Sequence, residues 1–328
     1  MTSKIFNLPK EDYVGDLGRM SYQIDSLHLR QTHVELNVSH FYKKNYHNEE
    51  IDVVTLGDSF FNGGGGGKNP YLQDYMVKKS NLKVLNIINF NPQQSPIALI
   101  ENMIKVGWFK KHKPKYLILE SAEKSIPSKF DLEKTFFIQN LEKLEKMILS
   151  PGHTLFTYVP KIKIINTANY KSLYYNIAYK FNRHAQKDVY KLKLKNKLFS
   201  INNNNHLLVY HEDIDYVKYF STKKLLQINN RMNTISKKLK KEGVKFIFFA
   251  AVDKFDLYRE YLIDKNLPTN TFFSDYEKLE KEYQFINTKK ILQPLLKQNI
   301  QDLFYIDDTH WSYKANDEIS TKLLEVLQ

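Results

Sequence analysis

The chain has 328 residues, 42% hydrophobic and 26% charged, with a formal net charge of +13, so it can bury a large core and has the composition of a soluble globular protein. The absence of cysteine excludes disulfides, thiolate nucleophiles and cysteine-based zinc sites. Residues 1–13 lack the apolar region of a signal peptide, and no stretch approaches the 18 uninterrupted apolar residues of a membrane-spanning helix.

Strands and helices are predicted to alternate along the chain, after a polar lead-in segment packed on the core. Continuous apolar runs predict strands at 51–56, 82–87, 115–121, 244–252 and 302–306. Helical patterns lie between and after them, at 69–79, 95–111, 222–243 and 312–328. Because strands that are buried on both faces and separated by helices form parallel sheets, we expect an α/β fold, a three-layer α/β/α sandwich. The lead-in spans 1–50, and the core spans 51–130 and 222–328.

Residues 131–221 interrupt the alternation and predict an inserted cap. A helix is expected at 131–149, and residues 190–199 alternate lysine with leucine before a turn at 201–205, which indicates a β-hairpin. Between Lys161 and Lys197 stand ten Lys/Arg residues against one acid. Such a basic segment favours an acidic polysaccharide, anionic lipid or nucleic acid. A solvated lysine surface that protects a sheet edge explains it equally well.

The stretch GDSFFNGGGGGKNP, residues 57–70, follows the first predicted strand. It is not a P-loop, because Asn69 follows Gly67-Lys68 where the magnesium-binding hydroxyl should stand. It fits a dinucleotide fingerprint poorly, since Pro70 stands where a helix should already pack on the strand. The alternative is that the turn presents Ser59 as a nucleophile.

The partners of such a serine stand near the C-terminus, in YIDDTHWS, residues 305–312. A nucleophilic serine needs a base, and that base needs an acid to orient it. Of ten histidines only His310 directly follows a predicted strand beside acids, so His310 is the candidate base, with Asp307 or Asp308 as its acid. Ser59 and His310 both follow predicted strands, and the carboxyl ends of parallel strands meet at one edge of a sheet.

GDSFF after the first strand and DDTHWS before the last helix resemble the SGNH (GDSL-type) hydrolase superfamily. The tryptophan after the histidine and the stretch ILESAEKS, residues 118–125, are similar to its alginate O-acetyltransferase-like branch. The resemblance covers roughly residues 50–130 and 230–328. It implies a mainly parallel, flavodoxin-like sheet and a triad of Ser59, His310 and an aspartate. Hydrolases of the superfamily imply Asp307, whereas the acetyltransferase branch implies Asp308, which we favour.

The superfamily's Gly-x-Asn-Asp block, which supplies an oxyanion donor, is missing after the third predicted strand. The Ser59 amide and the glycine loop 63–67 are the remaining candidates. We expect the residues at the strand ends to line the oxyanion and substrate sites, namely Gly63, Gly64, Glu120, Glu123, Lys254 and Trp311. For Lys254 an ion pair, and for Trp311 core packing, are the competing interpretations.

The resemblance implies a serine-dependent O-acetyltransferase acting on a cell-surface polysaccharide, with an acyl donor delivered by a membrane-bound acyltransferase. The alternatives are a carbohydrate esterase or deacetylase with the same triad, and an inactive SGNH-like module that binds acidic glycan. We expect no cofactor, no metal and no nucleic-acid partner. The resemblance implies the cell envelope or periplasm; the sequence itself fits the cytoplasm as well.

Overall fold

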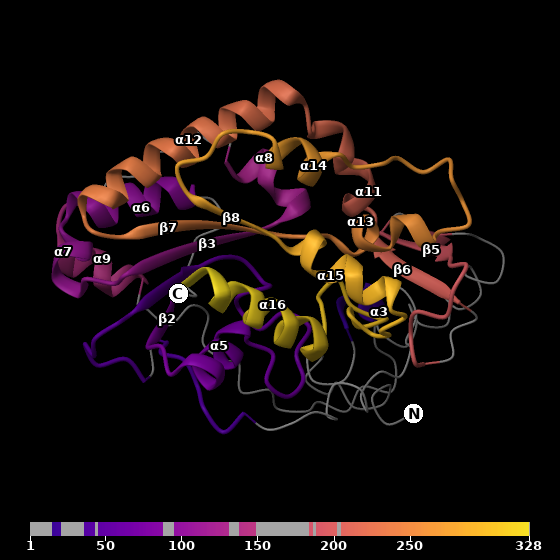
Figure 1. Cartoon of the computed structure of the whole chain (residues 1–328), viewed down its shortest axis with the longest axis horizontal. Helices are drawn as coiled ribbons and strands as arrows, with labels where there is room; N and C mark the ends of the chain where they lie inside the picture. The colour runs from indigo at the N-terminus through magenta and orange to yellow at the C-terminus, as the bar shows by residue number, and fades with distance from the viewer. Residues whose placement is uncertain are drawn as a thin grey trace, which may run out of the picture.

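The structure, a computed structural model, describes residues 15–20, 36–42, 45–87, 95–130, 138–148, 184–185, 188–201 and 205–327. Its centre is a five-stranded, entirely parallel sheet with helices on both faces (Figure 1). The strands lie in the order β2 (Val84–Ile87), β1 (Val53–Leu56), β3 (Tyr116–Ala122), β7 (Lys245–Ala251) and β8 (Gln284–Asn287). Counted in chain order this is 2-1-3-4-5, the flavodoxin-like order, and the predicted three-layer α/β/α sandwich is confirmed.

Strands β1, β2 and β3 are mostly apolar because they are covered on both faces, with Thr55, Asn86, Glu120 and Ser121 as their polar residues. Every residue of β1, β2 and β3 is buried, whereas the edge strand β8 has only one buried residue. The strand predicted at 302–306 is wrong. Asp302 adopts a left-handed conformation with φ 63°, and Phe304 forms only a single bridge to Trp311. The last strand of the sheet is instead β8, which the sequence analysis missed because its short run QFIN is half polar.

Two helical layers enclose the sheet. Figure 1 shows α6 (Pro96–Lys105) and α12 (Thr222–Lys241) above it, and α5 (Leu72–Ser80) and α16 (Tyr313–Leu327) below it, where α15 (Thr288–Lys297) also lies. The helix predicted at 95–111 is two helices, because Gly107 turns left-handed (φ 79°) between α6 and α7 (Trp108–His112). No helix in the described ranges is long and apolar enough to cross a bilayer.

The chain between β3 and α12 leaves the sheet. It holds η1 (Glu123–Ser125), α8 (Ile126–Lys129), α9 (Leu141–Ile148), the antiparallel strands β4 (His184–Ala185), β5 (Val189–Lys193) and β6 (His206–Tyr210), then α11 (Glu212–Asp215) and η2 (Tyr216–Tyr219). The hairpin prediction is confirmed for β5 and β6. Lys193, Lys195 and Lys197 are exposed and Lys191 is half-buried. Residues 131–137 and most of the basic segment, 161–183, lie outside the described residues.

Three short helices lie between β7 and β8. They are α13 (Lys254–Tyr258), η3 (Arg259–Tyr261) and α14 (Phe272–Glu277). Parts of the lead-in also pack on the core: Phe41 N donates to Val84 O at 2.7 Å, and α3 (Asp16–Met20) lies beside β6. Segments from the N-terminal part of the chain therefore lie beside β2 and β6.

Candidate active site

Ser59 lies in a tight turn directly after β1, and its side chain is exposed. The turn closes on itself through Gly64 N, which donates to Ser59 O at 2.7 Å, and through Asn62 Nδ2, which donates to Gly57 O at 3.2 Å. A side chain at Gly57 would overlap Glu120, with its Cβ 2.8 Å from the Glu120 Cβ. Glycine is therefore required at position 57 for β1 to deliver the serine so close to β3.

A pair of carboxyl groups ties this turn to the end of β3. Glu120 Oε2 accepts from Asp58 N at 2.7 Å, while Asp58 Oδ2 accepts from Ala122 N at 2.9 Å and Lys129 Nζ at 3.1 Å. Burial, then the Asp58 charge, raises the pKa of Glu120 well above its usual value. Burial opposes ionisation of Asp58 too, but Lys129 and the hydrogen bonds outweigh it and hold its pKa at about 2.

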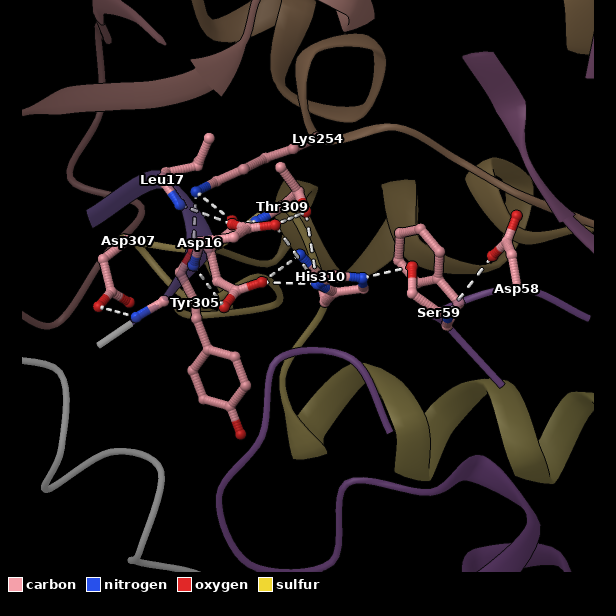
Figure 2. A network of polar contacts seen from close by, with 12 residues as sticks. Asp16, Leu17, Asp58, Ser59, Lys254, Tyr305, Asp307, Thr309 and His310 are labelled. Carbon is pink, nitrogen blue, oxygen red and sulfur yellow. Dashed lines mark hydrogen bonds and ion pairs between the residues drawn. The ribbon is translucent and has the colours of Figure 1, made fainter. Parts of the chain in front are cut away.

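His310 connects the serine to a carboxylate (Figure 2). Its Nε2 lies 2.7 Å from Ser59 Oγ, and its Nδ1 lies 2.6 Å from Asp308 Oδ1. Asp308 Oδ1 also accepts from the His310 amide at 3.0 Å. The turn therefore brings the Asp308 carboxylate back to the imidazole of His310, two residues later in the chain. With the ionised Asp308 as acceptor, Nδ1 carries the hydrogen and Nε2 is left to accept from the serine hydroxyl.

The environment of His310 favours its charged form. Burial alone would lower its pKa, but the hydrogen bond and charge of Asp308, and then the charge of Asp16, outweigh burial and raise the pKa above its usual value. Phe60 packs against the imidazole with ring centroids 4.9 Å apart, which holds the ring over Ser59. The imidazole is thus a base whose protonated form is stabilised.

Of the two predicted acids, Asp308 is the one at the histidine. Asp307, the other candidate, points to the N-terminal segment: its Oδ2 accepts from Gly15 N and its carbonyl from Gly18 N, both at 2.9 Å.

A further carboxylate, Asp16 of α3, was missed by the sequence analysis. Its Oδ1 accepts from Thr309 N at 2.8 Å, its Oδ2 accepts from the Thr309 hydroxyl, and Oδ2 lies 3.9 Å from His310 Nδ1 (Figure 2). Burial, and then the charge of Asp308, raises the pKa of Asp16. A single aspartate 292 residues before Asp308 has no local pattern that could have identified it.

Lys254 supports the histidine turn from inside the protein, whereas a residue lining a substrate site was expected. Its side chain is fully buried, and Nζ donates to the carbonyls of Tyr305, Ile306 and Asp308 at 2.7, 2.8 and 3.0 Å. Burial lowers its pKa to about 8, against the opposing charges of Asp307 and Asp308.

Three other predicted substrate-binding residues are also buried inside the protein. Trp311 is 2% exposed and packs on Phe60, with ring centroids 4.4 Å apart, so it cannot stack on a sugar. Glu123 accepts from Asp253 N at 3.0 Å and from Asn270 Nδ2 at 2.7 Å, and Glu120 accepts from Asp58 N as described above. Of the three, only Glu123 directly follows a strand; Glu120 lies within β3, and Trp311 follows the turn that replaces the predicted strand. Because all three are buried, their side chains support the site without lining it.

The residues of the serine turn differ in whether their amides are free to donate to an oxyanion. Gly64 cannot donate to an oxyanion as it stands, because its amide is bonded to Ser59 O, but it is the residue that leaves room for the His310 ring. The amides of Ser59 and Gly63 have no acceptor among the residues that the structure describes. They remain the candidate donors; residues 88–94, after β2, lie outside the described part of the chain.

Asp16, Asp308 and His310 offer atoms within 4.8 Å of one another, a spacing that could hold a metal ion. These atoms are already engaged: Asp308 Oδ1 accepts from His310, and both Asp16 oxygens accept from Thr309. The donor set therefore fits proton transfer between serine and histidine better than ion binding. No protein-family model matches the chain, and no curated protein shows significant sequence similarity to it.

Proposed function

We propose that this protein is a serine-dependent O-acyltransferase that moves an acetyl group onto a hydroxyl of a cell-surface polysaccharide through an acyl-Ser59 intermediate. The carrying observation is the unbroken chain of hydrogen bonds from Ser59 Oγ to His310 Nε2 and from Nδ1 to Asp308. We further propose membership of the SGNH superfamily and its alginate O-acetyltransferase-like branch, on the motifs around Ser59, Glu120 and His310.

In the first half-reaction, Ser59 Oγ attacks the acyl carbonyl carbon of the donor while its proton passes to His310 Nε2. The tetrahedral intermediate collapses by breaking the bond to the leaving oxygen, which takes the proton from Nε2. The product is acyl-Ser59 with a neutral imidazole. The Ser59 amide is the proposed donor to the oxyanion that forms on the carbonyl oxygen.

In the second half-reaction, a sugar hydroxyl gives its proton to Nε2 and attacks the acyl-Ser59 carbonyl carbon. Collapse breaks the bond to Ser59 Oγ, which recovers its proton from the imidazolium. In both halves Asp308 keeps the hydrogen on Nδ1 and stabilises the positive ring, which is the role of the acid in a Ser-His-Asp triad. An esterase would use the same groups with water as the acceptor.

The test is the mass of the intact protein after brief incubation with p-nitrophenyl acetate. We expect one acetyl adduct on the wild type and none on Ser59→Ala, with Ser274→Ala, a change in an exposed serine of α14, retaining it. An adduct that survives in water and is discharged by an oligosaccharide supports the transferase. Rapid discharge by water alone supports the esterase, and absence of an adduct from every protein refutes both.

A further inference from the structure

The N-terminal segment around α3 lies directly on the turn that carries the triad's acid and base. Four hydrogen bonds between the segment and the turn have backbone donors. The segment donates three, from Gly15 N to Asp307 Oδ2 and Gly18 N to Asp307 O at 2.9 Å and from Asp16 N to Asp308 Oδ2 at 3.2 Å. The turn donates the fourth, from Thr309 N to Asp16 Oδ1 at 2.8 Å. These contacts join residues about 292 positions apart. The segment is thus attached to three consecutive residues of the turn, Asp307, Asp308 and Thr309.

Asp16 makes the closest attachment. Both of its carboxylate oxygens accept from Thr309, one from the amide and one from the hydroxyl. Thr309 stands between Asp308 and His310, so fixing its backbone and side chain limits how the turn can rotate. A one-ångström displacement of a catalytic group costs orders of magnitude in rate, so such a clamp matters for Ser59 and His310.

The same carboxylate is a second negative charge beside the imidazole. Asp16 Oδ2 lies 3.9 Å from His310 Nδ1, behind Asp308 Oδ1 at 2.6 Å. Burial opposes the positive charge on His310, these two carboxylates favour it, and Lys124 opposes it. The buried Lys254 binds the carbonyls of the same turn. Asp16 therefore shifts the balance among these charges toward the imidazolium.

We propose that Asp16 is a positioning residue for acyl transfer: it clamps Thr309, and with it the His310 turn, and it stabilises the imidazolium that forms while Ser59 is acylated. This inference rests on the proposed function for its kinetic consequence, but its structural part stands on the contacts of Asp16 alone. The lead-in segment then supplies part of the site, although it lies far from the triad in sequence.

The test compares Asp16→Asn with wild type in the full chain, by two independent measurements. The first is the titration of the His310 imidazole by NMR, with the signal assigned from His310→Gln. We expect the His310 pKa to be about one unit lower in Asp16→Asn than in wild type, since an opposite charge at this distance shifts a pKa by about that amount or more. The second is the rate of Ser59 acetylation, which should fall about tenfold or more with the KM for p-nitrophenyl acetate nearly unchanged.

Two further variants separate positioning from general loss of structure. Thr309→Val removes the hydroxyl bonded to Asp16 and should lower the acetylation rate about threefold to tenfold, whereas Thr309→Ser should restore it. Glu142→Gln, which removes an exposed carboxylate of α9, should change neither measurement. If Asp16→Asn does not fold, the pair at Thr309 tests the same clamp.

The proposal is overturned if folded Asp16→Asn keeps both the His310 pKa and the acetylation rate of wild type, or if Thr309→Val and Thr309→Ser behave alike. Failure of the proposed function gives a different result. In that case no protein is acetylated at Ser59, yet the NMR titration still reports whether Asp16 acts on His310.

Discussion

The serine turn and the histidine turn are held in place by different kinds of contact. The serine turn, residues 57–65, is fixed by bonds within itself and to the adjacent strand β3, above all those donated by Gly64 N to Ser59 O and by Ala122 N to Asp58 Oδ2. The histidine turn, residues 303–312, is fixed by side chains from distant parts of the chain, Asp16 and Lys254. One turn therefore depends on the sheet, and the other on long-range attachments.

The two turns should therefore respond to different kinds of substitution. Little room exists around the serine turn, so an added atom there forces the backbone or the imidazole to move. The histidine turn has polar attachments that can be removed one at a time, so its loss of alignment can be graded. Variants at the two turns should accordingly differ in whether they act by steric overlap or by release of an attachment.

The largest effect is expected at the acid of the histidine turn. Asp308→Asn should lower the rate of Ser59 acetylation by about ten thousand-fold, because the amide no longer selects the tautomer that leaves Nε2 free to accept a proton. Asp307→Asn is the matched control, since its side chain can still accept from Gly15 N, and it should lose less than about tenfold. Equal losses in the two variants would contradict the assignment of Asp308.

On the serine turn, Gly64→Ala should lower the acetylation rate by about a hundredfold to a thousandfold. The added Cβ would overlap the His310 ring and lie 2.6 Å from Ser59 O, so the histidine must leave the serine. Gly107→Ala controls for losing a glycine: its Cβ meets no atom within 4 Å, and with φ 79° it costs stability but not reactivity. An active Gly64→Ala would show that this turn is more adaptable than its geometry indicates.

The sequence predicted the parts of the molecule that depend on local pattern. Continuous apolar runs identified β1, β2, β3 and β7, and the position of Ser59 after β1 followed from the rule that sites form at strand ends. The strand predicted at 302–306 is absent, yet the turn that replaces it still brings His310 to Ser59. β8 was not predicted because an edge strand need not be apolar. Residues 302–306 were wrongly predicted to form a strand because a buried turn can be as apolar as a strand.

The sequence could not predict the roles that depend on what covers the strand ends. Trp311 and Lys254 stand where substrate contacts were expected, yet neighbouring loops bury both. Asp16 reaches the site because α3 is bonded to the histidine turn, a contact that local spacing in the sequence does not indicate. Between Asp307 and Asp308 the choice depended on the direction of each side chain, which only the conformation of the turn decides.

A graded effect is expected from the buried attachment of the histidine turn. Lys254→Met keeps a long, unbranched side chain but removes the ammonium group and its three hydrogen bonds to the carbonyls of Tyr305, Ile306 and Asp308. We expect the free energy of unfolding to fall by about 2–4 kcal/mol, since buried carbonyls lose their donors, and the acetylation rate of the folded protein to fall about tenfold. Urea unfolding and acetylation kinetics measure the two effects, and a variant as stable and active as wild type would contradict the attachment.

The smallest effect on activity is expected at Glu120, behind the serine turn. Glu120→Gln should keep the acetylation rate within about threefold of wild type, because the amide oxygen can still accept from Asp58 N.

The stability of Glu120→Gln should differ from wild type instead. Burial raises the folded-state pKa of Glu120, so its stabilising contribution is complete below the unfolded-state pKa and is lost as pH rises toward the folded-state pKa. Relative to wild type, the variant should therefore gain about 1 kcal/mol or more in free energy of unfolding between pH 5 and pH 8. Urea unfolding at both values tests this, with Glu142→Gln as control: Lys146 lowers the pKa of that exposed carboxylate, so any change there has the opposite sign.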